Sequence, residues 1–178
     1  KIYDGMIDFA KYAFNKSHAA AYAVVSYQTA WLKYYYPVEF MAALMTSVID
    51  NPSKVSEYIY ACRQMDIQIL PPDINRGEAD FSVDGRNIRY GLAAIKSIGR
   101  PVVQAIIEDR EEYGPFKNLE DFITRLSAKE ILNKRIIENL IKAGALDTLG
   151  GTRKQFMSIY IQIVDHVNQE KKYSMTGQ

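Results

Sequence analysis

Apolar positions over residues 1–70 recur at helical spacing, and proline or asparagine interrupts the pattern where one helix should give way to the next. Pro37 stands at a first-turn position, and Asn51 followed by Pro52 is a typical helix start. We therefore predict that this half of the chain is all helical. Its helices are expected to end near Ala13, to run over 17–35 and 37–48, and to begin again at 52.

The pattern changes at Leu70, because Pro71 and Pro72 cannot continue a helix. Apolar and polar residues then alternate on both sides of Asp84-Gly85, which predicts a small β-hairpin. We expect a mainly α fold with a last amphipathic helix over 152–169 and a polar, frayed tail. The predicted segments are a helical subdomain at 1–70, a Pro-Pro linker and hairpin at 71–91, short paired helices at 92–150, and a final helix and tail at 151–178.

Composition narrows the class of protein. Of the 178 residues, 48% are hydrophobic and 24% are charged, which is typical of a soluble globular protein. No apolar run reaches the roughly 20 residues that cross a bilayer, and no signal-peptide pattern opens the chain, so we expect a cytoplasmic protein without a membrane partner. The lone Cys62 is expected to be a small core residue. Because the chain opens without Met inside a helical pattern, we expect a piece of a longer protein.

A net charge of +1 gives no general attraction to nucleic acid, so binding must come from local clusters. One cluster lies where the helix over 17–35 should begin, and it combines a cation, a hydroxyl and an imidazole. Amide donors and the positive end of the helix dipole converge there and favour a phosphate. Tyr22 follows His18 by four residues on the same helix face and offers a ring to a base or sugar. The residues predicted to bind nucleotide are Asn15, Lys16, Ser17, His18 and Tyr22.

A simpler interpretation of this cluster stays open. Ser17 would then be only an N-cap, and Tyr22 an ordinary half-buried aromatic residue.

Residues 92–107 form a second candidate site, with the pattern of a helix, a tight hairpin and a further helix. This resembles the helix-hairpin-helix element of DNA-handling proteins. Gly99 is expected to adopt a backbone conformation closed to other residues, and Ile98 to fill the space between the helices. Free amides at the next helix, with Lys96 and Arg100 beside them, would hold duplex phosphate without reading sequence.

Two departures from the usual pattern weaken this second site. Ser97 stands where the motif usually has glycine, so the hairpin should be less sharp, and Pro101 removes one amide donor. A plain helical turn remains the alternative interpretation.

A weaker copy of the motif follows. The capping box at Ser127–Glu130 predicts a helix start, and Gly144 is expected to end that helix in a left-handed C-cap. Physical reasoning alone favours a packing unit, although basic residues lie nearby. The residues predicted to bind DNA across both copies are Lys96, Ser97, Ile98, Gly99, Arg100, Lys134, Arg135 and Lys142.

Several stretches together resemble one family, the bacterial DNA polymerase III alpha subunit, in its DnaE-type branch of C-family replicative polymerases. They include Phe14–Tyr22, Val25–Ala30, Tyr36–Leu44, Leu70–Asn75, Tyr90–Lys96, Leu132–Arg135 and Gly144–Asp147. The resemblance covers roughly residues 4 to 155. It implies a fingers region over the nascent base pair, then a tandem helix-hairpin-helix that grips duplex DNA. It also implies a segment for the sliding clamp, of which Gln178 would be the first residue.

The chemistry of nucleotidyl transfer is expected to lie elsewhere. Two-metal catalysis needs carboxylates close together, commonly an Asp-x-Asp pair on a strand, and no such pair occurs here. The acidic pair Glu78 and Asp80 and the run 109–112 are interpreted as solvated charge. His18 and His166 have no ligand-like neighbours, so zinc is not expected. The resemblance implies a catalytic palm with Mg²⁺ outside this chain, which by itself should bind no cofactor and be inactive.

Two other classes of protein remain open. One is an accessory DNA-binding module of repair or recombination, and the other is a helical protein-interaction module that docks through its tyrosine-rich helices.

Overall fold

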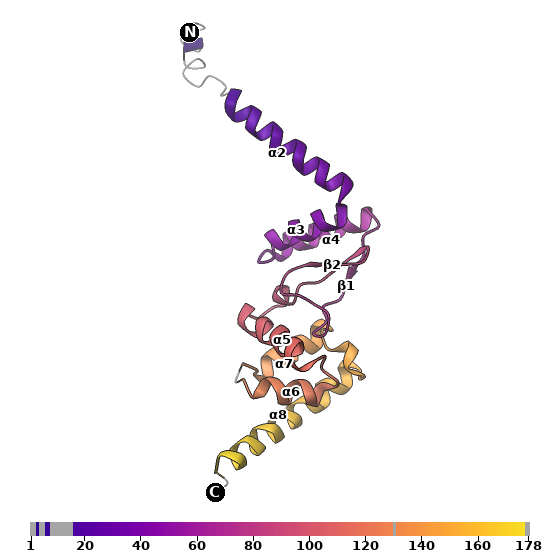
Figure 1. The fold of residues 1–178 in the computed structure, drawn as a ribbon, viewed down its shortest axis with the longest axis vertical. Helices are drawn as coiled ribbons and strands as arrows, with labels where there is room; N and C mark the ends of the chain where they lie inside the picture. Colours follow the sequence, from indigo (N-terminus) through magenta and orange to yellow (C-terminus); the bar gives the residue numbers. More distant parts are fainter. Residues whose placement is uncertain (1–2, 4–5, 8–15, 130, 177–178) are drawn as a thin grey trace.

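The computed structural model describes residues 3, 6–7, 16–129 and 131–176. The predicted first helix lies almost wholly outside these residues, as does Asn15. The molecule is elongated, with α2 at one end, α8 at the other and a small sheet between two groups of helices (Figure 1). The α-helices are α2 (Lys16–Tyr35), α3 (Pro37–Ser47), α4 (Pro52–Gln64), α5 (Arg100–Tyr113), α6 (Leu119–Ser127), α7 (Lys134–Ala143) and α8 (Arg153–Thr176), and the 3₁₀ turns are η1 (Leu92–Ala94) and η2 (Asp147–Leu149).

The first group of helices begins where the sequence predicted. Pro37 opens α3, and the side chain of Asn51 caps α4 by accepting a hydrogen bond from the amide of Lys54. Helices α3 and α4 share an apolar core with the sheet, which includes Met41, Met45, Val55, Cys62, Phe81 and Ile88. The core position expected for the lone cysteine is therefore confirmed, and burial raises the pKa of its thiol. Helix α2 contacts α3 but has no buried residue of its own.

The predicted β-hairpin is present as β2 (Ser82–Asp84) and β3 (Asn87–Arg89), paired antiparallel. Asp84 pairs with Asn87, so Gly85 and Arg86 form a two-residue turn, and Gly85 has a φ of +66°. A third strand, β1 (Ile69–Leu70), pairs in parallel with β3. The alternation pattern did not predict β1, because two residues are too short to show a period.

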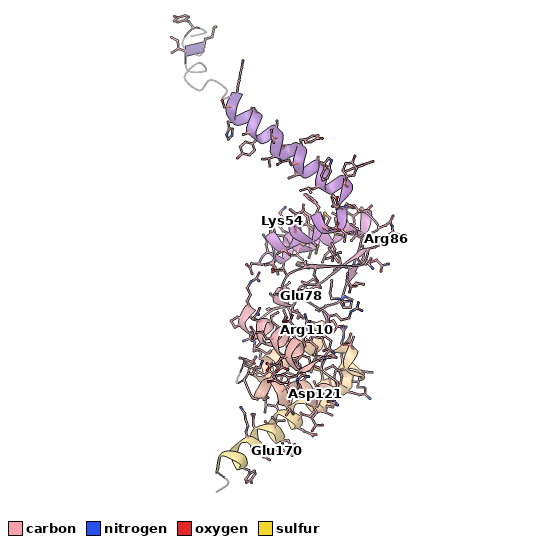
Figure 2. All side chains as sticks on the ribbon, in the orientation of Figure 1. Lys54, Glu78, Arg86, Arg110, Asp121 and Glu170 are labelled. Carbon is pink, nitrogen blue, oxygen red and sulfur yellow. The ribbon has the colours of Figure 1, made fainter. Side chains whose placement is uncertain are left out.

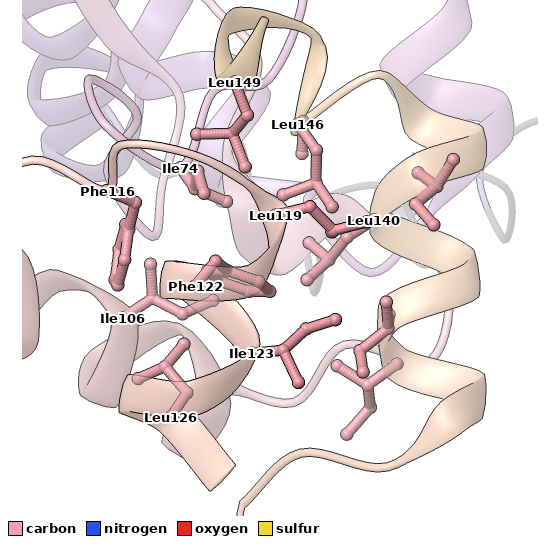
Figure 3. Packing of buried hydrophobic residues seen from close by; sticks show 14 of the residues in the cluster. Ile74, Ile106, Phe116, Leu119, Phe122, Ile123, Leu126, Leu140, Leu146 and Leu149 are labelled. Atoms are coloured by element: carbon pink, nitrogen blue, oxygen red, sulfur yellow. The ribbon is translucent and has the colours of Figure 1, made fainter. Parts of the chain in front are cut away.

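A second core unites α5 to α8 (Figure 3). Ile106, Phe122, Ile123, Leu126, Leu140 and Ile141 are fully buried in it. Gly144 ends α7 in the left-handed conformation, as predicted, whereas α8 continues to Thr176 instead of ending near 169.

The capping box predicted at Ser127 is wrong, because Ser127 is the last residue of α6. Asn133 caps α7 instead, since its side chain accepts a hydrogen bond from the amide of Ile136 at 2.9 Å.

Hydrogen bonds fix the Pro-Pro linker between the two cores. Arg89 is only 6% exposed, and it donates to the carbonyl of Pro71 at 2.9 Å and to the carboxylate of Asp84 at 2.6 Å. The hydrogen bond from Arg89 holds the pKa of the Asp84 carboxyl below its usual range. Farther along, Arg110, labelled beside Glu78 in Figure 2, donates to the carbonyls of Ile74 and Gly77. The linker is thus a braced segment between the two groups of helices.

Candidate nucleic-acid interface

The hairpin before α5 has its sharp turn at Ser97, which has a φ of +64°. Gly99 has ordinary extended angles of φ −80° and ψ 152°, so the expectation that it adopts a glycine-only conformation is wrong. The first helix of the motif is also shorter than predicted, because only the 3₁₀ turn η1 precedes the hairpin. Ser97 therefore supplies the left-handed turn that the usual glycine would supply, and the hairpin stays sharp.

Ile98 is 5% exposed and lies in the second core, which confirms that it fills the space between the helices. At the start of α5, Pro101 has no amide hydrogen, and the amides of Val102 and Val103 both donate to the carbonyl of Gly99. The entrance therefore offers fewer free donors than its sequence pattern suggests. Its capacity for an anion depends mainly on side chains.

Helix α7 brings further basic side chains to the first hairpin. The guanidinium of Arg135 donates to the hydroxyl of Ser97 at 3.4 Å. Lys142 lines one groove with Lys96, and Arg135 and Lys142 are two helical turns apart on the same face of α7. The groove has a volume of about 1030 Å³ and extends to Pro71, Pro72 and Tyr90. Basic residues from the two predicted copies of the helix-hairpin-helix motif thus lie at one surface.

Asn139 also lines this groove, although no sequence motif had indicated it. It lies between Arg135 and Lys142 at spacings of four and three residues, which is the signal that could have identified it. Lys134 points elsewhere, because its ammonium pairs with Asp165 of α8 at 2.7 Å. Lys134 is therefore not part of the surface that contains Lys96 and Arg135.

Carboxylates partner several of the predicted DNA-binding cations. Arg100 pairs with Asp80 at 2.7 Å, and this contact raises the pKa of the guanidinium. Lys142 pairs with Glu138 and holds the pKa of that carboxyl below its usual range. Within the described part of the chain, neither Lys96 nor Arg135 has an ion pair.

The interpretation of the acidic residues as solvated charge needs correction at three positions. Glu78 pairs with the largely buried Arg110 at 2.8 Å. Asp80 is an ion-pair partner of Arg100. Asp109 is 2% exposed and lies between the basic groups of Arg125 and Lys129. The helical pattern placed Asp109 on a polar face, but α6 packs over that face and covers it.

The predicted nucleotide entrance lies at the start of α2. Lys16, Ser17 and His18 are exposed in its first turn, and Tyr22 is 61% exposed with its ring centroid 4.5 Å from that of His18. Ser17 lies within the described part of the helix, and Tyr22 is exposed rather than half-buried. This entrance is far along the molecule from the hairpin (Figure 1).

The described residues offer neither a membrane span nor a metal site. Among the described residues, no helix is long and apolar enough to cross a membrane. No group of three or more histidine, cysteine or acidic side chains in that part of the chain could hold a metal ion.

Comparison with known proteins identifies the class. A family model described as a helix-hairpin-helix motif matches residues 66–156, so the chain belongs to the helix-hairpin-helix family. It is also similar to DNA polymerase III subunit alpha of Thermus aquaticus, with 49% identity over 159 residues, and of Deinococcus radiodurans, with 52% identity over 150 residues. The Vibrio cholerae subunit is 49% identical over 179 residues and matches 100% of the chain. The predicted resemblance to that polymerase family is therefore confirmed.

The matches cover most of this chain but only a small part of each relative. The Thermus and Deinococcus proteins match 89% and 84% of the chain, but the chain spans only 13% and 11% of their length. It spans 15% of the Vibrio protein.

Proposed function

We propose that this chain is the late fingers and helix-hairpin-helix part of a replicative DNA-directed DNA polymerase. The convergence of Lys96, Ser97 and Arg135 on one exposed surface carries the duplex-binding part of this proposal. Cations beside a tight hairpin bind phosphate without reading bases, which suits an enzyme that must accept any sequence. The similarity to DNA polymerase III alpha subunits along the whole chain supports the polymerase setting.

Fluorescence anisotropy of the 178-residue chain with duplex DNA across a salt series tests the duplex grip. Replacing Lys96 and Arg135 with alanine should lower affinity about tenfold or more and reduce the magnitude of the salt slope by about two, because two phosphate contacts are lost. Lys54→Ala combined with Arg63→Ala is the matched control, since it removes one lysine and one arginine, both exposed on α4. Equal affinities of the double variant and the control would reject the duplex grip.

The nucleotide part rests on the exposed entrance of α2. Lys16, Ser17 and His18 would lie near the phosphates of an incoming deoxynucleoside triphosphate, with Tyr22 near the nascent pair and Asn15 orienting the turn. The test is nucleotide incorporation by an intact DNA polymerase III alpha subunit that carries this segment. Lys16→Ala and His18→Ala should raise the KM for nucleotide. Lys33→Ala is the control, because it removes the same charge about 25 Å farther along the helix.

The remaining functions belong to the longer protein. We propose that a palm outside this chain holds Mg²⁺ and performs nucleotidyl transfer in the cytoplasm. The sliding clamp would bind through the segment that follows Gln178. Gln178 itself lies outside the described residues.

A protein-docking role for α2 is the second candidate. Tyr27 and Tyr34 are 70% and 78% exposed, and no acidic residue lies on this helix. If the chain is only a protein-interaction module, it should not bind duplex DNA at moderate salt in the anisotropy experiment above.

A further inference from the structure

We propose that Asp80 is an internal competitor of DNA phosphate for Arg100, so that the chain weakens its own grip on the duplex. This inference rests on the proposed function. The guanidinium of Arg100 and the carboxylate of Asp80 lie 2.7 Å apart, and their side chains are 60% and 43% exposed. A carboxylate and a phosphate offer the same kind of oxygens to a guanidinium. A phosphate that binds the same guanidinium nitrogen of Arg100 has to displace Asp80.

The backbone fixes Asp80 beside the hairpin. The amides of Leu92 and Ala93 donate to the carbonyls of Glu78 and Ala79 at 2.9 and 3.0 Å. The Asp80 backbone also packs directly on Gly91, where an added Cβ would lie 2.7 Å from the Asp80 carbonyl carbon. The backbone that carries the Asp80 carboxylate is thus fixed against η1. Pairing with Arg100 therefore costs little additional conformational entropy.

The pair of Glu138 and Lys142 differs in this respect. Its partners are four residues apart on α7, and such pairs within one helix contribute little. We therefore assign the competitor role to Asp80, and expect Glu138 to have a smaller effect.

DNA binding is weakened because phosphate has to replace Asp80 as the partner of Arg100. In the free chain Arg100 already has an ion-pair partner, so a phosphate contact that displaces Asp80 replaces one ion pair by another. The net gain is then smaller than for Lys96 or Arg135, which have no ion pair within the described residues. A weaker, readily exchanged contact suits a protein that has to move along duplex DNA after each addition.

The experiment is duplex binding by the 178-residue chain at fixed moderate salt. Asp80→Asn should tighten binding about twofold to fivefold, the range expected for removal of one exposed ion pair. Glu57→Gln is the control, because it makes the same change in net charge in a pair on α4. The comparison therefore separates loss of the competitor from a general gain in positive charge.

A double-mutant cycle then tests the partner. Arg100→Gln should weaken binding more in the Asp80→Asn chain than in the unchanged chain, because only there is Arg100 available. Circular dichroism checks that each variant folds.

Two results would overturn the inference. Equal effects of Asp80→Asn and Glu57→Gln, in a chain that Lys96→Ala still weakens, would reject the competitor and leave the duplex grip intact. Absence of binding by every variant, even at low salt, would reject the proposed duplex function, and the competitor with it.

Discussion

At the scale of single residues, the hairpin turn is made by Ser97 and not by Gly99. A serine at a φ of +64° is strained, because its Cβ crowds the carbonyl oxygen. Ser97→Gly should therefore stabilise the chain by about 0.5–1 kcal/mol, less than the full strain because glycine is more flexible when unfolded. Urea unfolding followed by circular dichroism measures the difference.

The matched change at Gly99 should have little effect. An added Cβ there would meet only the ring of Pro101 at an ordinary 3.5 Å, so Gly99→Ala should change stability by less than about 0.5 kcal/mol. If Gly99→Ala were strongly destabilising and Ser97→Gly neutral, the assignment of the turn to Ser97 would be wrong. A loss of duplex affinity without a loss of stability would show that DNA approaches Gly99 closely.

At the scale of elements, Asp109 joins α5 to α6. The Nε atom of Arg125 donates to its carboxylate at 2.7 Å, and a second guanidinium nitrogen donates to the carbonyls of Asp109 and Gly114. The Arg125 guanidinium also stacks 4.2 Å from the ring centroid of Phe116. Asp109→Ala should destabilise the chain by about 3 kcal/mol, because it leaves a largely buried cation without its main partner. Thermal and urea unfolding measure this loss.

Glu111→Ala is the control for Asp109, since Glu111 is exposed on the same helix. It should stay within about 0.5 kcal/mol of the unchanged chain. A similar small loss in both variants would contradict a joining role for Asp109.

The boundaries that sequence could predict are those set by backbone chemistry. Pro37, Asn51 and Gly144 each begin or end a helix as expected, because proline, a capping amide and a left-handed glycine act locally. The box at Ser127 failed because the fully buried Leu126 keeps Ser127 in the last turn of α6, where it cannot cap a following helix. Tertiary packing overrides a local cap there.

In the candidate site, too, local sequence features could be predicted and long-range contacts could not. The exposed cluster at Lys16–His18 and the basic hairpin could be recognised along the chain. The pairing of Arg100 with Asp80 and the approach of Arg135 to Ser97 depend on contacts over 20 and 38 residues. No pattern of neighbouring residues contains that information.

At the scale of the whole molecule, the two sites lie at different levels along the long axis (Figure 1). Helix α2 has 20 residues, so it alone is about 30 Å long. A single nucleotide cannot span that distance, but a primer–template duplex that ends in a nascent pair can. The proposed polymerase role therefore needs the linker to hold the two groups of helices in a fixed relation.

Asn75 anchors the end of the linker to the second group of helices. Its side-chain amide donates to the carbonyl of Phe116 at 2.9 Å and accepts from the amide of Phe116 at 2.8 Å. Asn75→Ala leaves both backbone groups without these partners, so it should destabilise the chain by about 2 kcal/mol. It should also speed hydrogen exchange at the amide of Phe116 and proteolysis between 71 and 80. Asn168→Ala, an exposed asparagine on α8, should do neither. If Asn75→Ala left exchange and proteolysis unchanged, the brace would have to come from Arg89 and Arg110 alone.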